Sequence, residues 1–228
     1  MAQKNTWENE YKNQRLITGS DKPQKAFLKY LKFLKKERNL KIEGLNVLDL
    51  GSGVGKNSIY LAELGANVTG LDISPTAIRT AKERAKENNL NIDFRESNIG
   101  SKLPFTDESF NLILDIMTSN SLSGPEREIY LKEVKRVLKT SGNFFVRTLK
   151  LEGDKNAKNL LKTSPGKETG TYFIKDLGLT EKVFSRDELE KTYSKYFKIL
   201  KIEDHTGYAK FGNQNYKRNY WITYLENK

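Results

Sequence analysis

The chain has 228 residues, of which 36% are hydrophobic and 11% aromatic, and this length favours one domain with an ample core. It contains no cysteine, which excludes disulfides, thiolate metal sites and cysteine nucleophiles. The formal net charge of +11 is compatible with a nucleic-acid partner, but the lysines are scattered along every segment, which is typical of a solvated surface.

The N-terminal residues are polar, and they contain no apolar segment of the kind found in signal peptides. No part of the chain approaches the roughly 18 apolar residues that span a bilayer, so we expect a soluble, cytoplasmic protein with no membrane partner. Residues 24–38 place Phe27, Leu31 and Leu34 at helical spacing among lysines, which predicts an amphipathic helix. We expect residues 1–40 to form a helical arm that acts as a lid.

Strands and helices are expected to alternate through the middle of the chain. The expected strands are residues 46–50, 67–72, 91–97, 111–117 and 142–149, and the expected helices are residues 56–64, 74–88 and 125–139. Alternation of this kind, with apolar strands, indicates a parallel sheet covered on both faces. Residues 45–149 are therefore expected to form an α/β core.

The last third of the chain departs from this alternation. Residues 150–184 are expected to form an insert that contributes to the lid. Ser185 and Glu188 have the spacing of a capping box, which predicts a helix as far as about residue 196. Residues 197–204 and 219–227 are expected to be two paired closing strands. Residues 185–228 would then complete a single domain that spans residues 1–228.

A glycine-rich loop, Gly51, Gly53 and Gly55, follows the first expected strand. A phosphate-binding P-loop requires serine or threonine where Asn57 stands, and a dinucleotide-binding loop requires glycine where Lys56 stands. A pyrophosphate group would therefore lack its usual cradle. Glycines in this position still allow a ligand to approach the main chain closely.

Two carboxylates narrow the choice of ligand. Asp49 precedes the loop by two residues, where it is poorly matched to a phosphate but suits a positively charged group. Asp72 ends the second strand about 20 residues further on, in the position that binds ribose hydroxyls in nucleotide sites. A ligand with a ribose, a positive charge and no phosphate is indicated. S-adenosylmethionine meets this description.

The motifs between residues 45 and 149 resemble those of the class I S-adenosylmethionine-dependent methyltransferases, in the same order and with approximately the same spacing. They are DLGSGVG (49–55), GLDIS (70–74), NIGSKLPF (98–105), DESFNLILD (107–115) and VLKTSGNFF (137–145). The resemblance implies a Rossmann-like, doubly wound, seven-stranded, mostly parallel sheet whose last strand is antiparallel. It also implies S-adenosyl-L-methionine as methyl donor and S-adenosyl-L-homocysteine as product. The WENEY segment and the aromatic final strands resemble the small-molecule members of the family, including the thiopurine- and tellurite-type enzymes.

The resemblance also implies a set of cofactor-binding residues. These are Asp49, Gly51, Ser52, Gly53, Gly55, Asp72, Ile73, Asn98, Ile99 and Asp115. Asp49 and the loop main chain would hold the methionine part, and Asp72 the ribose. The family often has an aspartate for the adenine amino group, where this sequence has Ser97 and Asn98. The Asn98 amide oxygen can accept that hydrogen bond without a charge.

Motifs that are absent from the sequence narrow the class of methyl acceptor. Without cysteine, ring-carbon methylation through a thiol adduct is excluded. The [DN]-P-P-[YFW] motif of amino-methylating enzymes is missing from residues 115–121, and there is no metal-ligand cluster. The only histidine, His205, is a candidate general base, or else an ordinary surface residue. A small-molecule acceptor is favoured over RNA or protein, and a non-catalytic cofactor-binding module and a nicotinamide oxidoreductase are weaker alternatives. The oligomeric state is not predicted.

Overall fold

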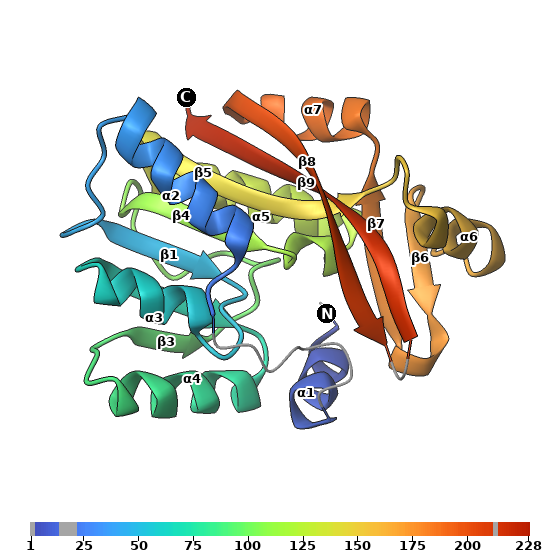
Figure 1. The fold of residues 1–228 in the computed structure, drawn as a ribbon, viewed down its shortest axis with the longest axis horizontal. Coiled ribbons are helices and arrows are strands. Elements are labelled where there is room, and N and C mark those ends of the chain that lie inside the picture. The colour runs from blue at the N-terminus through green and yellow to red at the C-terminus, as the bar shows by residue number, and fades with distance from the viewer. Residues whose placement is uncertain (1–2, 14–21, 212–213) are drawn as a thin grey trace.

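The computed structural model describes residues 3–13, 22–211 and 214–228, and it gives no side-chain placement for residues 209–215. A single twisted sheet runs through the molecule, with helices on both of its faces (Figure 1). The order of the strands explains where the functional site lies.

The first five strands are parallel and form the core of the sheet, in the order β3-β2-β1-β4-β5. They are β1 (Asn46–Leu50), β2 (Asn67–Asp72), β3 (Asp93–Glu96), β4 (Phe110–Ile116) and β5 (Leu138–Lys150). The connecting helices are α3 (Lys56–Glu63), α4 (Pro75–Glu87) and α5 (Gly124–Val137). The predicted doubly wound core is confirmed. Because the strands are parallel, their carboxyl ends meet at one edge of the sheet, where ligands bind in this architecture.

The C-terminal strands complete the sheet beside β5. Helix α7 (Arg186–Ser194) leads into β8 (Phe197–Phe211), which pairs with β9 (Gln214–Asn227) in antiparallel fashion. Strand β9 is also antiparallel to β5, from Asn143 opposite Glu226 to Leu149 opposite Tyr220. The predicted antiparallel last strand is therefore confirmed.

Strands β8 and β9 are both longer than their sequences indicate. The polar residues between the two expected strands are typical of a loop. In the structure these residues extend both strands, because the backbone of each strand supplies the hydrogen-bonding partners of the other.

The segment between residues 150 and 184 contributes two further strands to the sheet. It contains α6 (Lys155–Thr163), β6 (Thr171–Ile174), a short 3-10 helix η2 (Lys175–Leu177) and β7 (Leu179–Phe184). Strand β7 runs parallel to the end of β5, with Leu149 opposite Val183 and Lys150 opposite Phe184. Strand β6 is antiparallel to β7. The seven predicted strands are thus joined by a two-stranded extension at the edge that carries the carboxyl ends.

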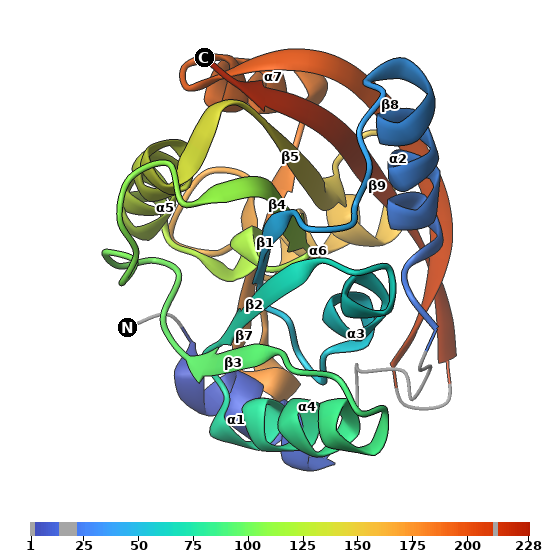
Figure 2. The same ribbon diagram turned by 90° about the vertical axis from the view of Figure 1, so that its left-hand side faces the viewer.

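Helices cover both faces of the sheet (Figure 2), and each face has its own apolar cluster. Helices α5 and α7 pack on one face. Helix α2 (Lys25–Glu37) packs on the other, beside α3. The fully buried Tyr30 of α2 lies with its ring centroid 4.9 Å from Phe145 and 4.6 Å from Tyr224. The amphipathic helix predicted for residues 24–38 is confirmed, with its lysines on the outer side.

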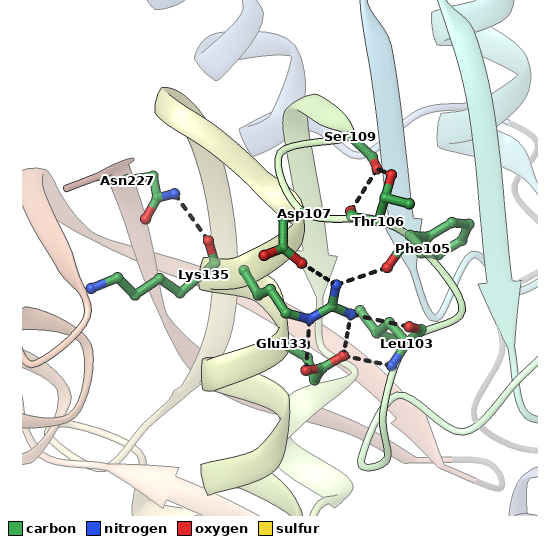
Figure 3. Close-up of polar contacts among 9 residues, drawn as sticks. Leu103, Phe105, Thr106, Asp107, Ser109, Glu133, Lys135 and Asn227 are labelled. Atoms are coloured by element: carbon green, nitrogen blue, oxygen red, sulfur yellow. Dashed lines mark hydrogen bonds and ion pairs between the residues drawn. The ribbon is translucent and has the colours of Figure 1, made fainter.

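A polar clamp fixes the loop that follows β3 against α5 (Figure 3). The Arg136 guanidinium donates to the carbonyl oxygens of Leu103 and Phe105, at 3.1 and 2.7 Å, and to the Glu133 carboxylate at 2.6 Å. The Leu103 amide in turn donates to Glu133 at 2.7 Å. The loop carrying Asn98 and Ile99 therefore starts from a strand and ends in an anchored segment.

Candidate active site

A cavity of about 310 Å³ lies at the carboxyl edge of the sheet. It is bounded by the ends of the core strands, by the N-terminal helix α1 (Lys4–Asn13), by the 150–184 segment and by β9. The lining residues are Trp7, Tyr11, Gly51, Asp72, Ile73, Ser97, Asn98, Ile99, Ile116, Met117, Thr118, Ser121, Leu122, Leu149, Ile174, Glu181, Arg218 and Tyr220.

The glycine loop brings main chain close to the cavity. Gly51 and Gly53 have φ values of +72° and +56°, a region that favours glycine. A Cβ atom on Gly51 would lie 2.1 Å from Oγ1 of Thr118, and one on Gly53 would lie 2.6 Å from the Tyr11 hydroxyl. Side chains from the turn after β4 and from α1 thus occupy the space that the missing Cβ atoms leave. No other residue type fits either position without rearrangement.

The third loop glycine, Gly55, serves packing. Its φ is +82°, and it precedes α3 directly. A Cβ atom there would lie 2.8 Å from the Phe94 ring and 3.2 Å from Ala81 Cβ. Its predicted role in close packing agrees with this geometry, and Gly55 does not line the cavity.

Asp72 presents a carboxylate at the glycine-loop end of the cavity. It is 5% exposed, and it accepts hydrogen bonds from the Gly53 and Ser74 amides, each at 2.9 Å. Burial raises the pKa of Asp72 to about 6, and the hydrogen bonds from the Ser74 and Gly53 main chain oppose that rise. The Tyr11 hydroxyl also hydrogen-bonds to this carboxyl group. Helix α1 therefore contacts the residue predicted to bind the ribose.

Asp49 lies beneath the loop, outside the cavity lining. It is 1% exposed, and the Ser58 hydroxyl donates to its carboxylate at 2.7 Å. Burial raises the pKa of Asp49 to about 6; the Ser58 bond opposes that rise, whereas the negative charge of Asp72 adds to it. Two buried acids with raised pKa values lie close together here, so a cation bound beside them would stabilise their ionised forms.

Ile73, Ser97, Asn98 and Ile99 form the wall on the β2–β3 side of the cavity. The Asn98 side-chain oxygen accepts a hydrogen bond from the Gly100 amide at 2.9 Å. An amide oxygen has two lone pairs, so one remains for a ligand donor. The two isoleucines give this wall an apolar surface that suits an adenine ring.

Six predicted site residues lie outside the cavity lining: Asp49, Ser52, Gly53, Gly55, Asp115 and His205. Asp115 is fully buried on the α5 face, where it accepts from the Tyr130 hydroxyl at 2.6 Å. Ser52 is buried, and its hydroxyl has no partner among the described residues.

His205 was expected to follow a strand, but it lies within β8, its ring 6.4 Å from that of Tyr220. Burial, together with the positive charge of Arg147, lowers the pKa of His205.

Helix α1 covers the cavity and is anchored on both sides of it. On the core side, the Glu8 carboxylate accepts from the Ser74 hydroxyl at 2.6 Å and from the Thr76 hydroxyl and amide at 2.7 and 3.1 Å. Burial opposes ionisation of Glu8, but these hydrogen bonds prevail and lower its pKa to about 2. Glu8 thereby adds a negative charge at the N-terminus of α4, where the helix dipole favours it.

The other anchor of α1 is the 150–184 segment. The Gln3 amide donates to the carbonyl oxygens of Ser121 and Thr180, at 2.7 and 2.8 Å. The Thr6 hydroxyl donates to the Gly178 carbonyl at 3.0 Å. The helix therefore joins the core to the insert across the top of the cavity.

The end of the cavity away from the glycine loop contains a charged cluster that the sequence did not identify. Glu181 of β7 and Arg218 of β9 both line the cavity, and both are at least nine-tenths buried. Arg218 donates to the Tyr172 hydroxyl at 2.6 Å and to Asp154 at 3.2 Å. Arg218 lies outside the strand expected at residues 219–227, but β9 begins at Gln214 and includes it. The alternation of Tyr216, Arg218 and Tyr220 is typical of a strand.

Within residues 3–13, 22–211 and 214–228, no helix has the length and apolar character that crossing a membrane requires. In the same part of the chain no cluster of three or more His, Cys, Asp or Glu side chains is arranged to hold a metal ion.

The family model described as "Methyltransferase domain" matches residues 41–202. The chain is 32% identical over 160 residues to a ubiquinone biosynthesis O-methyltransferase of Brucella ovis, an alignment that covers 68% of the chain and 60% of that protein. It is 42% identical over 104 residues to the ribosomal protein L11 methyltransferase of Dictyoglomus thermophilum, which covers 44% of the chain and 31% of that protein. The chain thus spans less than two thirds of the length of these curated relatives.

The solved structures include an S-adenosylmethionine-dependent methyltransferase of Methanosarcina mazei. It superposes with a TM-score of 0.73 at 26% sequence identity, over 84% of this chain and 95% of that one.

Proposed function

The chain belongs to the class I S-adenosylmethionine-dependent methyltransferases, and on this premise we propose that it methylates a small molecule that binds beneath α1. The observation that supports a small acceptor is the shape of the site. One cavity of about 310 Å³ is lined both by Asp72 on the cofactor side and by Glu181 on the far side, and α1 covers it. A covered cavity of this kind suits a small ligand better than an extended chain.

The residues of the site fit the cofactor. Asp72 presents a buried carboxylate to the cavity, which suits ribose hydroxyls, and Ile73 and Ile99 present apolar surface for adenine. Asp49 and the main chain at Gly51 suit the ammonium of the methionine part. When bound, S-adenosylmethionine supplies an electrophilic methyl group on a sulfonium centre. In this proposal residues 45–149 bind the cofactor, residues 1–40 and 150–184 form the lid, and residues 185–228 complete the domain.

The chain's own contribution is positioning and exclusion of water. Gln3 and Thr6 hold α1 to the insert, while Glu8 holds it to α4, so the cavity is closed from the side of the N-terminus. A covered cavity keeps the acceptor and the methyl donor in one orientation, and this supplies much of the rate enhancement available to a bimolecular displacement.

An RNA or protein acceptor is the alternative. The net charge of +11 favours this alternative. The similarity to the ribosomal protein L11 methyltransferase also favours it, because the name of that relative states a protein substrate. A macromolecule would have to insert one base or side chain under α1.

The two are separated by incubating the protein with methyl-labelled S-adenosylmethionine and an extract of the native host, then fractionating metabolites, RNA and protein. We expect label in the metabolite fraction with the wild-type chain, strongly reduced label with Asp72→Ala, and full label with Asp187→Ala, which removes an exposed carboxylate. Label confined to RNA or protein would replace the proposal by its alternative. No label in any fraction, with cofactor binding intact, would indicate a non-catalytic module.

A further inference from the structure

The 150–184 segment places one carboxylate in the wall of the cavity. Glu181 stands on β7, is 8% exposed and lines the same cavity as Asp72. Leu149 of β5 lies opposite Val183 of β7, and Glu181 precedes Val183 by two residues, so the two side chains share a face of β7. The carboxylate therefore comes from the insert and not from the cofactor-binding core.

One oxygen of Glu181 is held, and the other is available. The Tyr172 hydroxyl donates to Oε2 at 2.7 Å, and Nη2 of Arg218 lies 3.8 Å from the same oxygen. Within the described part of the chain, Oε1 receives no hydrogen bond. An ionised carboxylate can accept several, so Oε1 has capacity for a ligand donor.

Arg218 is held from two sides within this cluster. Its Nε donates to Asp154 at 3.2 Å, and its Nη2 donates to the Tyr172 hydroxyl at 2.6 Å. Asp154 is fully buried and does not line the cavity, so Glu181 is the carboxylate of the cluster that a ligand meets. A ligand that contacts Oε1 meets a negative group, which disfavours an anion there.

The remaining wall at this end is apolar and aromatic. Trp7, Leu149, Ile174 and Tyr220 line it, and the Arg147 guanidinium lies 3.6 Å from the centre of the Tyr220 ring without lining the cavity. A ligand with an unsaturated ring and one hydrogen-bond donor matches a surface of this kind.

We propose that Glu181 is the acceptor-side catalytic residue: it binds the hydrogen of the nucleophilic O–H or N–H of a non-anionic, ring-bearing acceptor and takes that proton during methyl transfer. This rests on the proposed function. A lone pair of the acceptor oxygen or nitrogen forms the new bond to the methyl carbon. The carbon–sulfur bond breaks and its electron pair remains on sulfur, and the acceptor's proton passes to the Glu181 carboxylate and then to solvent.

Binding of three matched probes tests the charge preference without any turnover. Benzyl alcohol, benzylammonium and benzoate share a ring and differ in charge. Their dissociation constants are measured by calorimetry on protein saturated with S-adenosyl-L-homocysteine, so that the cofactor side is filled. We expect the wild-type chain to bind the alcohol and the ammonium at least about tenfold more tightly than benzoate.

Two variants remove the same charge from the cluster at different places. Glu181→Gln removes it from the cavity wall and should abolish the preference against benzoate. Asp154→Asn removes it from the opposite side of Arg218, where the Asp154 side chain is fully buried and caps α6 through the Ala157 amide at 2.8 Å. This control should keep the wild-type preference. Equal binding of benzoate by the wild-type chain, no binding of any probe, or equal effects of the two variants would each overturn the proposal.

Transfer to the labelled metabolite gives the second readout. Glu181→Gln should lower the rate of methyl transfer by about 10²–10⁴-fold, the usual contribution of a proton acceptor, with cofactor affinity unchanged. An undiminished rate would refute proton acceptance by Glu181. Absence of transfer by the wild-type chain would instead refute the proposed function, while the probe preferences would still decide what the Glu181 end of the cavity binds.

Discussion

The substitution Asp49→Asn is expected to stabilise the protein near neutral pH while weakening its cofactor site. Asp49 is 1% exposed, and burial raises its pKa from 3.8 to about 6. The folded state therefore retains the proton over a pH range in which the unfolded chain has already lost it. Stability from this group is fully present below the unfolded pKa and is lost as the pH rises through about 6.

The size of the effect follows from that shift. About two pKa units correspond to about 3 kcal/mol of free energy of unfolding, an upper value because the charges of Asp72 and Asp115 also contribute to it. An asparagine carries no charge, and its side-chain oxygen still accepts the Ser58 hydrogen bond. The gain should be near zero at about pH 4 and approach 3 kcal/mol above about pH 7. In a chain of this size that is an increase of about 6–10 °C in melting temperature.

The assay is urea or thermal unfolding of the cofactor-free wild-type and Asp49→Asn proteins at about pH 4.5 and pH 7.5. Asp187→Asn serves as the control, since it removes an exposed carboxylate. Calorimetry with S-adenosylmethionine should show weaker binding by Asp49→Asn, because the loop loses its negative charge near the ligand's ammonium. If the variant is no more stable at pH 7.5 than at pH 4.5, relative to wild type, Asp49 is not a strained carboxylate and the reasoning fails.

Three further substitutions test other parts of the fold. Gly55→Ala should destabilise the protein by more than Gly44→Ala, as urea unfolding would show. Both glycines have positive φ, but a Cβ added at Gly55 would lie 2.8 Å from the Phe94 ring, whereas one added at Gly44 would meet nothing within 4 Å. Equal losses of stability would rule out the clash at Gly55. Arg136→Met should lower the free energy of unfolding by about 2–3 kcal/mol by releasing the clamp on Leu103 and Phe105, whereas its exposed neighbour Lys135→Met should be nearly neutral. Glu8→Gln should detach α1 more often, and limited proteolysis of α1 should then be faster. The loss in free energy of unfolding should be under about 1 kcal/mol, because Glu8 is partly open to solvent. Unchanged proteolysis would show that Glu8 does not hold the helix. The stabilising effect of Glu8 should persist above about pH 4.5 and fade as the pH falls toward 2, because its pKa is lowered to about 2.

The cofactor half of the molecule was predictable because its determinants are local. The strand β1 and the loop after it combine an apolar run with glycines whose φ values, +72° at Gly51 and +56° at Gly53, few other residues adopt. Asp72 and Ile73 follow from the end of the next strand, and both line the cavity. Short-range spacing alone places these groups, since parallel strands end at a common edge.

Asp115 lies at the end of the predicted strand, but its side chain is on the α5 face and outside the cavity lining. In β4, Ile113 packs in the cluster on the α5 side, and side chains two apart in a strand share a face. Asp115 therefore points toward Tyr130, where the hydrogen bond at 2.6 Å is found. The alternation was visible in the sequence, but the motif outweighed it.

The acceptor end could not be predicted, because its contacts join distant segments. Asp154, Tyr172, Glu181 and Arg218 meet only after the insert has been added to the end of β5 and β9 has folded back beside it. His205 was expected after the end of a strand and lies inside one for a related reason. The sequence around it has no apolar pattern, and the strand is stabilised there by pairing with β9, where His205 lies opposite Tyr220.

The attachment of β7 to β5 is short, and this has a consequence for how such a protein diversifies. Only Leu149 and Lys150 of β5 pair with β7, yet the segment beyond them supplies Ile174 and Glu181 to the cavity. In the proposed function this segment contacts the acceptor, and its strand β7 pairs with the end of β5 at these two positions. Exchange of the segment between relatives is then expected to change the molecule that is methylated and to leave the methyl donor's pocket in place.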